Sequence, residues 1–81
     1  MYEVIIHMQN EDPIVAEMEK LPDPTHLNIL VTNPRRRDGK PLPYATEGAR
    51  AFVFPWSRIS FVEIMSGEEE EKEVEEFFRE S

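Results

Sequence analysis

The segment Tyr2–Met8, YEVIIHM, indicates the class of fold, because it is rich in β-branched residues and partly alternates apolar with polar side chains. Both features are typical of a β-strand. A cluster of turn-forming residues follows at positions 9–13 and ends in Pro13. The chain is therefore expected to begin on a strand and to reverse direction directly after it.

Four further strands are expected downstream. Residues 14–21 place Ile14, Ala16 and Met18 on one face, which favours a strand, although the Ala, Glu, Met and Lys content would also suit a helix. Prolines break the chain at residues 22–25. Apolar runs then predict strands at 26–32, 50–54 and 59–65, and residues 33–48 form the longest irregular stretch. Within it, Asp38-Gly39 favours a tight primed turn, so residues 35–37 and 40–42 are expected to form a protruding hairpin.

The last part of the chain has a different composition. Residues 68–80 hold eight glutamates against Lys72 and Arg79, a local charge of −6 out of the total of −8. Val74, Phe77 and Phe78 lie at i, i+3 and i+4, so the segment is a helix if something covers that stripe and a frayed acidic tail if nothing does. The predicted organisation is a β-barrel domain at 1–66 and an acidic C-terminal helix or tail at 67–81.

Composition narrows the possible classes of protein. Eighty-one residues are expected to form one domain, and the absence of cysteine excludes disulfides and thiolate metal sites. Two histidines without acidic residues at ligand spacing argue against a structural metal, so we expect no metal and no cofactor. Self-association remains as a source of stability for so small a domain. Without a secretory signal or an apolar run of about 20 residues, a cytoplasmic location is the expectation.

Five strands with short links and one long excursion predict a mostly β protein with a small, closed, strongly bent sheet. Closure would remove exposed strand edges, and the chain has too few residues for a seven-stranded sandwich. The expected fold class is therefore a five-stranded SH3-like or Sm-like barrel with a C-terminal acidic helix.

The order of elements over residues 2–65 resembles the Sm-like family, which includes the bacterial Hfq proteins. The family's first motif ends in Asp-x-His-Met-Asn and apolar residues, and residues 23–31, DPTHLNILV, are similar with one extra residue after the aspartate. Its second motif spans two strands joined by a very tight turn, and residues 54–62, FPWSRISFV, correspond to it. The family's glycine in strand two is absent, Pro55-Trp56 stands in place of an Arg-Gly pair, and the helix comes last instead of first.

The resemblance implies rings of subunits that bind single-stranded RNA. Segments 52–54 and 59–62 carry apolar residues on both faces, so apolar surface remains after one barrel is filled. We therefore expect a cyclic oligomer in which the fourth strand of one subunit pairs with the fifth strand of the next.

The resemblance also assigns a base-binding pocket to His26, Asn28, Trp56 and Arg58, whose flat or hydrogen-bonding side chains suit stacking and base-edge recognition. The alternative is structural: His26 and Asn28 would tie down a loop, and Trp56 would plug the end of the barrel or a subunit contact.

A compact basic segment adds a second candidate RNA-binding region. Its members are Arg35, Arg36, Arg37 and Lys40, with Tyr44 nearby as a stacking platform. These cations would grip phosphates, bind the glutamate-rich segment, or simply form a solvated hairpin tip.

Catalysis is not expected, because the sequence has no nucleophile motif and no glycine-rich loop for phosphate. Glu3, Glu17, Glu19 and Glu63 alternate with apolar residues and are expected to point outward, and His7 lies inside an apolar strand. Two functions remain open. One is a ring-forming Sm-like protein that binds short single-stranded RNA or serves as an assembly hub. The other is an SH3-like module that docks a protein partner and has no nucleic-acid activity.

Overall fold

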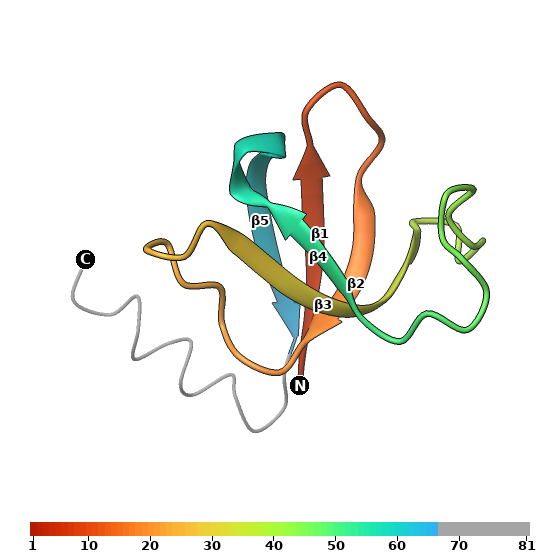
Figure 1. Cartoon of the computed structure of the whole chain (residues 1–81), viewed down its shortest axis with the longest axis horizontal. Coiled ribbons are helices and arrows are strands. Elements are labelled where there is room, and N and C mark those ends of the chain that lie inside the picture. Colours follow the sequence, from red (N-terminus) through yellow and green to blue (C-terminus); the bar gives the residue numbers. More distant parts are fainter. Residues whose placement is uncertain (67–81) are drawn as a thin grey trace.

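The computed structural model describes residues 1–66, so the helix expected within 67–81 lies outside the described residues. Five antiparallel strands form a single curled sheet with the spatial order β4-β3-β2-β1-β5 (Figure 1). The elements are β1 (Tyr2–Met8), β2 (Ile14–Met18), β3 (Asn28–Arg36), β4 (Phe52–Pro55), the 3₁₀ turn η1 (Trp56–Arg58) and β5 (Ile59–Ser66). The expectation of a mostly β fold is confirmed, and residues 14–18 form a strand and not a helix.

The centre of the sheet is the hairpin of β1 and β2. Tyr2 lies opposite Met18 and Ile6 opposite Ile14, so the apolar positions of both strands face the same side. Asn10 adopts φ of 61° in the connecting turn, a left-handed conformation that asparagine tolerates better than most residues. The alternation of apolar side chains therefore fixes the register of this hairpin.

Strand β3 is longer than the sequence predicts, and it bends. Its first part, residues 28–31, pairs with β4, whereas Thr32, Arg35 and Arg36 pair with β2. Thr32 lies opposite Glu17 and Arg35 opposite Val15, so three steps along β3 match two along β2 and one residue is extra. This β-bulge contains Asn33, at φ of 49°, and Pro34, whose missing N–H is tolerated at such a place.

The predicted end of the third strand at residue 32 was therefore wrong. Proline is a strand breaker only where the ladder needs its N–H, and the bulge removes that need. Because β3 pairs with β4 before the bend and with β2 after it, the sheet curls over its own apolar face. The start of this strand, at Asn28, is also two residues later than expected.

The expected hairpin follows β3, with a turn of a different type. Arg36 N donates to Lys40 O and Gly39 N donates to Arg36 O, both at 2.9 Å. A type I′ turn needs positive φ at both central residues and a type II′ turn needs it at the first, but of Asp38 and Gly39 only Gly39, at φ of 87°, lies in that region. The chain reverses through a three-residue loop with its glycine in the left-handed position. This Gly39 conformation is what the Asp-Gly pair supplies.

The core lies inside the curl of the sheet. Its buried apolar side chains come mainly from β1, β2 and the first part of β3, and Leu42 and Ile59 complete it: Tyr2, Val4, Ile6, Met8, Ile14, Ala16, Met18, Ile29, Val31, Leu42 and Ile59. Leu42 is 7% exposed, so it anchors the long segment between β3 and β4. No helix within residues 1–66 is long and apolar enough to cross a membrane.

The sheet is a half-barrel, and the expectation of closure was wrong. Strand β4 pairs with β3, and β5 pairs with β1, but β4 and β5 do not pair with each other within residues 1–66. They are joined by the three residues of η1, which turn the chain from one margin of the sheet to the other. Within the described part of the chain, each of these strands therefore has one edge without a strand neighbour.

Candidate functional site

The residues predicted to bind RNA fall into two separate regions. His26 and Asn28 line a shallow cavity of about 170 Å³ beside the β2–β3 connection. Arg36, Arg37, Tyr44 and Arg58 line hollows beside the β1–β2 turn and the β3–β4 segment. In Figure 1 the β2–β3 connection and the hairpin after β3 lie on opposite sides of the molecule. The structure therefore does not bring the nine residues into one site.

A local hydrogen-bond network holds His26 in the first region. Thr25 donates from its N and its Oγ1 to Asp23 Oδ1, at 2.8 and 2.7 Å. His26 N donates to Asp23 O at 3.0 Å, and His26 Nε2 lies 3.5 Å from Asp23 Oδ2. The hydroxyl of Thr25 is the main reason that the pKa of Asp23 lies below its usual value. This geometry fastens the loop and leaves an ionised carboxylate beside the imidazole.

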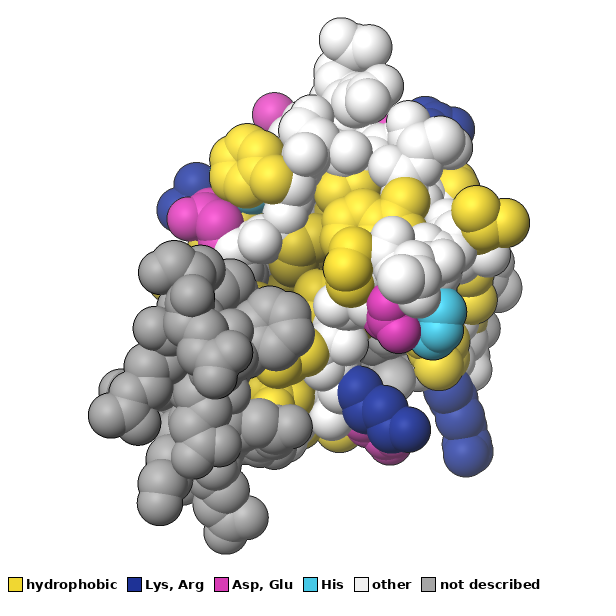
Figure 2. Space-filling view, turned by 90° about the vertical axis from the view of Figure 1, so that its left-hand side faces the viewer, with side chains coloured by type: hydrophobic (Ala, Val, Ile, Leu, Met, Phe, Trp, Pro, Cys, Tyr) yellow, Lys and Arg dark blue, Asp and Glu magenta, His cyan; other side chains and the backbone are white. Residues whose placement is uncertain are grey.

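The cavity around His26 is acidic at its rim. Its charged lining consists of Glu17, Glu19 and Asp23 against Lys20, while Met18, Leu21 and Ile29 supply its apolar surface. An excess of carboxylates repels a phosphate backbone. Figure 2 shows apolar side chains gathered on the side of the molecule that lies on the left in Figure 1.

Trp56 lies near Asn28 through its backbone. Its N donates to Leu27 O at 2.9 Å, and Pro55 lies opposite Asn28 in the β3–β4 ladder. The indole is half-buried and packs against the core. Its Nε1 is buried without a hydrogen-bond partner among the described residues. The ring therefore contributes to the core more than to an open stacking platform.

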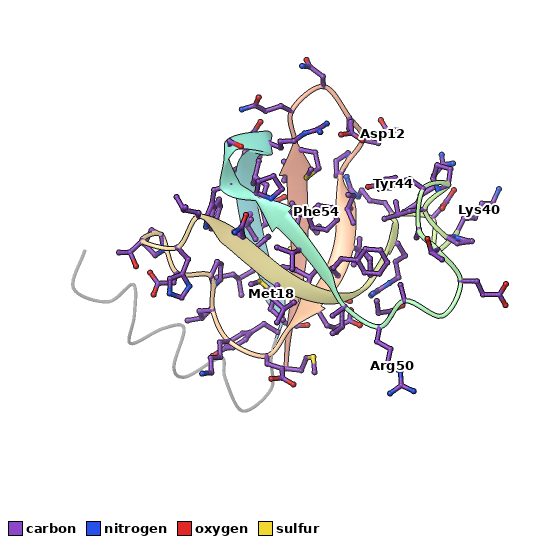
Figure 3. The ribbon with its side chains drawn as sticks, viewed as in Figure 1. Asp12, Met18, Lys40, Tyr44, Arg50 and Phe54 are labelled. Carbon is purple, nitrogen blue, oxygen red and sulfur yellow. The ribbon has the colours of Figure 1, made fainter. Side chains whose placement is uncertain are left out.

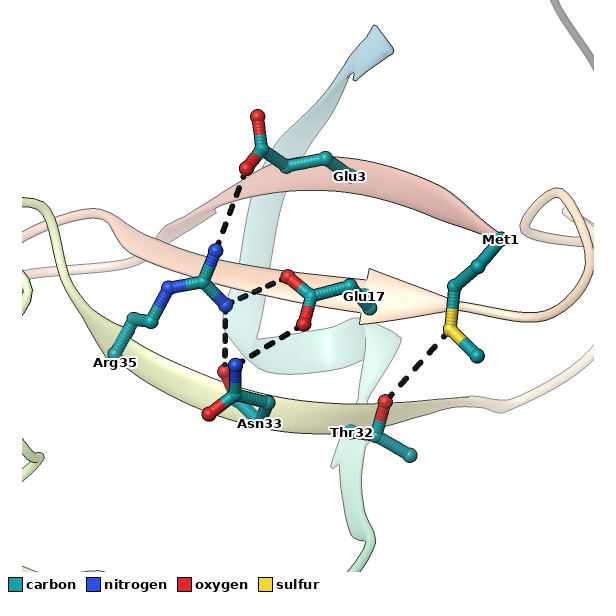
Figure 4. A network of polar contacts seen from close by, with 6 residues as sticks. All are labelled: Met1, Glu3, Glu17, Thr32, Asn33 and Arg35. Carbon is teal, nitrogen blue, oxygen red and sulfur yellow. Dashed lines mark hydrogen bonds and ion pairs between the residues drawn. The ribbon is translucent and has the colours of Figure 1, made fainter. Parts of the chain in front are cut away.

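Within the basic segment, Arg35 differs from the other cations because it forms ion pairs. Arg35 Nη1 lies 2.6 Å from Glu17 Oε2, and Arg35 Nη2 lies 3.3 Å from Glu3 Oε2 (Figure 4). Nη1 also donates to Asn33 O at 2.9 Å, and Asn33 Nδ2 donates to Glu17 Oε1 at 3.1 Å. Arg35 thus joins three strands across the outer face of the sheet. Its guanidinium is engaged by carboxylates and is poorly placed for phosphate.

The other three cations of the basic segment are exposed to solvent. Arg36, Arg37 and Lys40 are exposed, and none has a carboxylate within ion-pair distance among residues 1–66. Arg36 and Arg37 line a hollow of about 290 Å³ together with Asp12, Pro13 and Asp38.

Tyr44 connects this hollow to a second group of residues. Arg36 and Tyr44 line a hollow of about 320 Å³, and Tyr44 and Arg58 line another of about 270 Å³. Neighbouring hollows share lining residues, so they form one surface depression, the Tyr44 groove. Its lining is Met8, Glu11, Asp12, Pro13, Ile14, Arg36, Arg37, Asp38, Leu42, Pro43, Tyr44, Phe54, Pro55 and Arg58.

Glu11, Tyr44 and Arg58 interact electrostatically at the centre of the groove. Arg58 Nη2 lies 3.3 Å from Glu11 Oε2. Burial raises the pKa of the Tyr44 hydroxyl, the carboxylate of Glu11 raises it further, and Arg58 opposes both. The phenol therefore stays protonated in neutral solution and can donate a hydrogen bond.

Several residues of this groove carried no signal in the sequence. Glu11, Asp12 and Pro13 look like an ordinary turn, and Leu42 and Pro43 belong to a segment without periodicity. Only the curl of the sheet brings them together. No group of three or more His, Cys, Asp or Glu within residues 1–66 is placed to hold a metal ion.

Comparison with known proteins adds no relative: no family model, curated protein or solved structure matches the chain. The resemblance to the Sm-like family therefore stays a prediction.

Proposed function

We propose that the protein is a self-assembling module that forms a cyclic oligomer, in which β4 of one subunit pairs with β5 of the next, and that this ring serves as an assembly hub. The observation that carries the proposal is the pair of sheet edges, on β4 and on β5, that have no strand neighbour within residues 1–66. Strand β5 has eight residues, contains no proline or lysine, and has one charged residue, Glu63. Edges of this kind readily pair with another strand unless lysine, proline or a covering element protects them.

Exposed apolar side chains on both margins support the same proposal. Val53 in β4 is 61% exposed, and Leu30, its partner across the β3–β4 ladder, has the same value. On β5, Phe61 is 53% and Met65 51% exposed. Pairing between subunits would bury these side chains and satisfy the backbone groups of both edges at once.

The difference between the two edges favours a ring. If β4 met β4 and β5 met β5, each contact would be a two-fold interface that uses the same surface twice. A β4-to-β5 contact is head-to-tail and leaves one edge of each kind free for the next subunit. Head-to-tail contacts close into a ring when the rotation between subunits allows it.

The test uses one blocked edge at a time. Val53→Lys places a charge on β4, Phe61→Lys places one on β5, and the control Ala49→Lys adds the same charge to an exposed position outside the strands. We expect the wild type and Ala49→Lys to be oligomers by light scattering and native mass spectrometry. Val53→Lys and Phe61→Lys should each be monomers with unchanged far-ultraviolet circular dichroism.

Mixing the two blocked variants identifies the geometry of the contact. Val53→Lys retains a free β5 and Phe61→Lys a free β4, so an equimolar mixture should form a heterodimer and nothing larger. Dimers of Val53→Lys alone would instead indicate a β5-to-β5 contact. A wild-type chain that remains a monomer at high micromolar concentration would refute the proposal.

Single-stranded RNA binding is a second candidate function, and the placement of His26 and Asn28 on one cavity favours it. An imidazole can stack on a base, and a side-chain amide can hydrogen-bond its edge. The carboxylates of Glu17, Glu19 and Asp23 on the same cavity oppose it.

Labelled oligouridylate and oligoadenylate, titrated at low and moderate salt, test this candidate by fluorescence anisotropy. Asn28→Ala should cost roughly 1–3 kcal/mol of binding free energy if Asn28 contacts a base, whereas Arg50→Ala is the control. A flat titration with both oligonucleotides at low salt would end the RNA hypothesis and leave the assembly proposal intact.

A further inference from the structure

We propose that the glutamate-rich segment, residues 68–80, docks back on its own chain and covers the core-facing side of β5, at the open margin of the half-barrel. The segment would make this contact through Val74, Phe77 and Phe78, and its target would be Val62 and Ile64. The contact uses a face of β5 and not its backbone edge, so it is independent of ring assembly.

The target residues point to the core side of the sheet. In the β1–β5 ladder Ile6 lies opposite Val62, and Val4 lies opposite Ile64. Directly paired residues share a face of the sheet. Ile6 and Val4 are fully buried. Val62 and Ile64 pack against the same core but are only half-buried. The core is therefore less complete along β5 than along β1.

The position of β5 explains this difference. Met18 on β2 and Phe54 on β4 lie inside the curl of the sheet (Figure 3). Strand β5 forms a margin of that curl, since within residues 1–66 it pairs with β1 alone. Apolar side chains at such a margin bury more of their surface when a further element packs over them.

The chain continues from this margin into a segment with a matching apolar stripe. Val74, Phe77 and Phe78 are the three apolar residues among positions 68–80, which lie outside the described residues. Their spacing of i, i+3 and i+4 corresponds to one side of an α-helix. A helix this short is marginal in water and needs a surface on which to pack its stripe. The stripe supplies the apolar area that the core side of β5 lacks.

The length of the segment and the place where β5 ends favour docking within one chain. Ser66 ends β5, and Gly67 follows with the backbone freedom that a reversal of direction requires. A helix from Ser66 to Phe78 would extend about 18 Å, whereas the eight residues of β5 span about 26 Å. A helix that reverses at Gly67 therefore runs back along β5 and brings its stripe to the level of Ile64 and Val62.

Charge selects the core-facing side of β5 over its outer side. The outer side of the sheet beside β5 carries three carboxylates, Glu63, Glu3 and Glu17, of which the last two share Arg35. The eight glutamates of the segment would be repelled there. The core-facing residues of β1 and β5 are uncharged. A helix with its stripe on this side turns its glutamates toward solvent.

The absence of cysteine makes disulfide trapping in the full chain a direct test. Ile64→Cys is combined either with Phe77→Cys, on the stripe, or with Glu76→Cys, which is the neighbouring position on the opposite side of a helix. Under mild oxidation the variant with Phe77→Cys should form an intramolecular disulfide about tenfold faster or more, because docking brings only the stripe within bonding distance. Equal rates for the two variants would mean that the segment does not dock through its stripe.

The place of docking and the chain that provides the segment are tested separately. Val53→Cys, on the exposed outer side of β4, should react with Phe77→Cys as slowly as the Glu76→Cys control does. Faster trapping there would place the segment on the outer side and overturn the proposal. The mass under non-reducing conditions distinguishes an intramolecular disulfide from one between chains. A disulfide between chains as the main product would also overturn docking within one chain.

A second measurement does not depend on disulfide geometry. In the full chain, Phe77→Ala and Phe78→Ala should each change the methyl chemical shifts of Val62 and Ile64, because each removes an aromatic ring from contact with them. Glu76→Ala is the matched control and should leave those shifts unchanged. Unchanged methyl shifts in both phenylalanine variants would overturn the proposal.

Discussion

The centre and the margins of the sheet differ sharply in burial. Five of the seven residues of β1 and three of the five in β2 are buried, whereas β5 has one buried residue among eight and β4 has none. Both regions contain comparable proportions of β-branched and aromatic residues. The difference therefore comes from position in the sheet, since a central strand has neighbours on two sides and a marginal strand has one.

This difference in burial suggests different roles for the two regions, stability for the centre and contact with partners for the margins. The centre buries its apolar side chains within the chain and should supply most of the free energy of unfolding. The margins retain exposed apolar side chains and, within residues 1–66, one edge each without a strand neighbour, which are the features that a partner strand can use. Substitutions that distinguish the two regions therefore test the whole interpretation.

The largest effect is expected at the centre. Ile6 is fully buried between two strands, so Ile6→Ala should lower the free energy of unfolding by about 2–5 kcal/mol, because it removes apolar contacts and leaves a cavity. In the monomer, Val53→Ala at the margin should lower the free energy of unfolding by less than about 0.5 kcal/mol. Urea unfolding followed by circular dichroism measures both. Similar losses for the two variants would contradict the division into centre and margin.

A smaller effect is expected on the outer face of the centre. Arg35→Ala should lower stability by about 1 kcal/mol, because Glu3 and Glu17 would lose their shared partner and would then repel each other. The loss should shrink in high salt, which screens that repulsion. Arg50→Ala, an exposed arginine without an ion pair among the described residues, provides the comparison and should leave the urea midpoint unchanged.

The bend between centre and margin offers a third test. Asn33 is held at φ of 49°, where a β-carbon is unfavourable and asparagine is better tolerated than alanine. Asn33→Ala should cost about 1 kcal/mol, and Asn33→Gly should cost less because glycine adopts this conformation freely. If alanine and glycine have equal effects in urea unfolding, the hydrogen bond from Asn33 to Glu17 matters more than the backbone conformation.

The smallest effect is expected in the connection between β2 and β3, which belongs to neither region. Thr25→Val removes the hydroxyl that lowers the pKa of Asp23, so that pKa should rise toward its ordinary value. A carboxyl whose pKa is lowered by folding stabilises the protein above its unfolded pKa, and this contribution disappears as pH falls through the folded pKa. Carboxyl carbon shifts in an NMR pH titration follow Asp23 directly. An unchanged titration in Thr25→Val would contradict the role of the hydroxyl.

The sequence by itself determined the strands and much of the core. The alternation in Tyr2–Met8 and in Ile14–Met18 gives the class of fold, and the same positions are buried in the structure. The hairpin around Asp38-Gly39 was also predictable, because only a few residues can adopt the conformation that Gly39 requires. These features are local, so a pattern over a few neighbouring residues is enough to specify them.

Only the tertiary structure decided which side chains meet. The bulge at Asn33 and Pro34 allows β3 to continue to Arg36, so Arg35 lies beside Glu3 and Glu17. Its guanidinium therefore pairs with carboxylates and does not act together with the neighbouring cations. The curl of the sheet brings Tyr44 beside Glu11 and Arg58, which are distant in sequence. Such contacts depend on strand register and on where the sheet bends. A local pattern of propensities contains neither, because both are set by pairing between residues that are far apart along the chain.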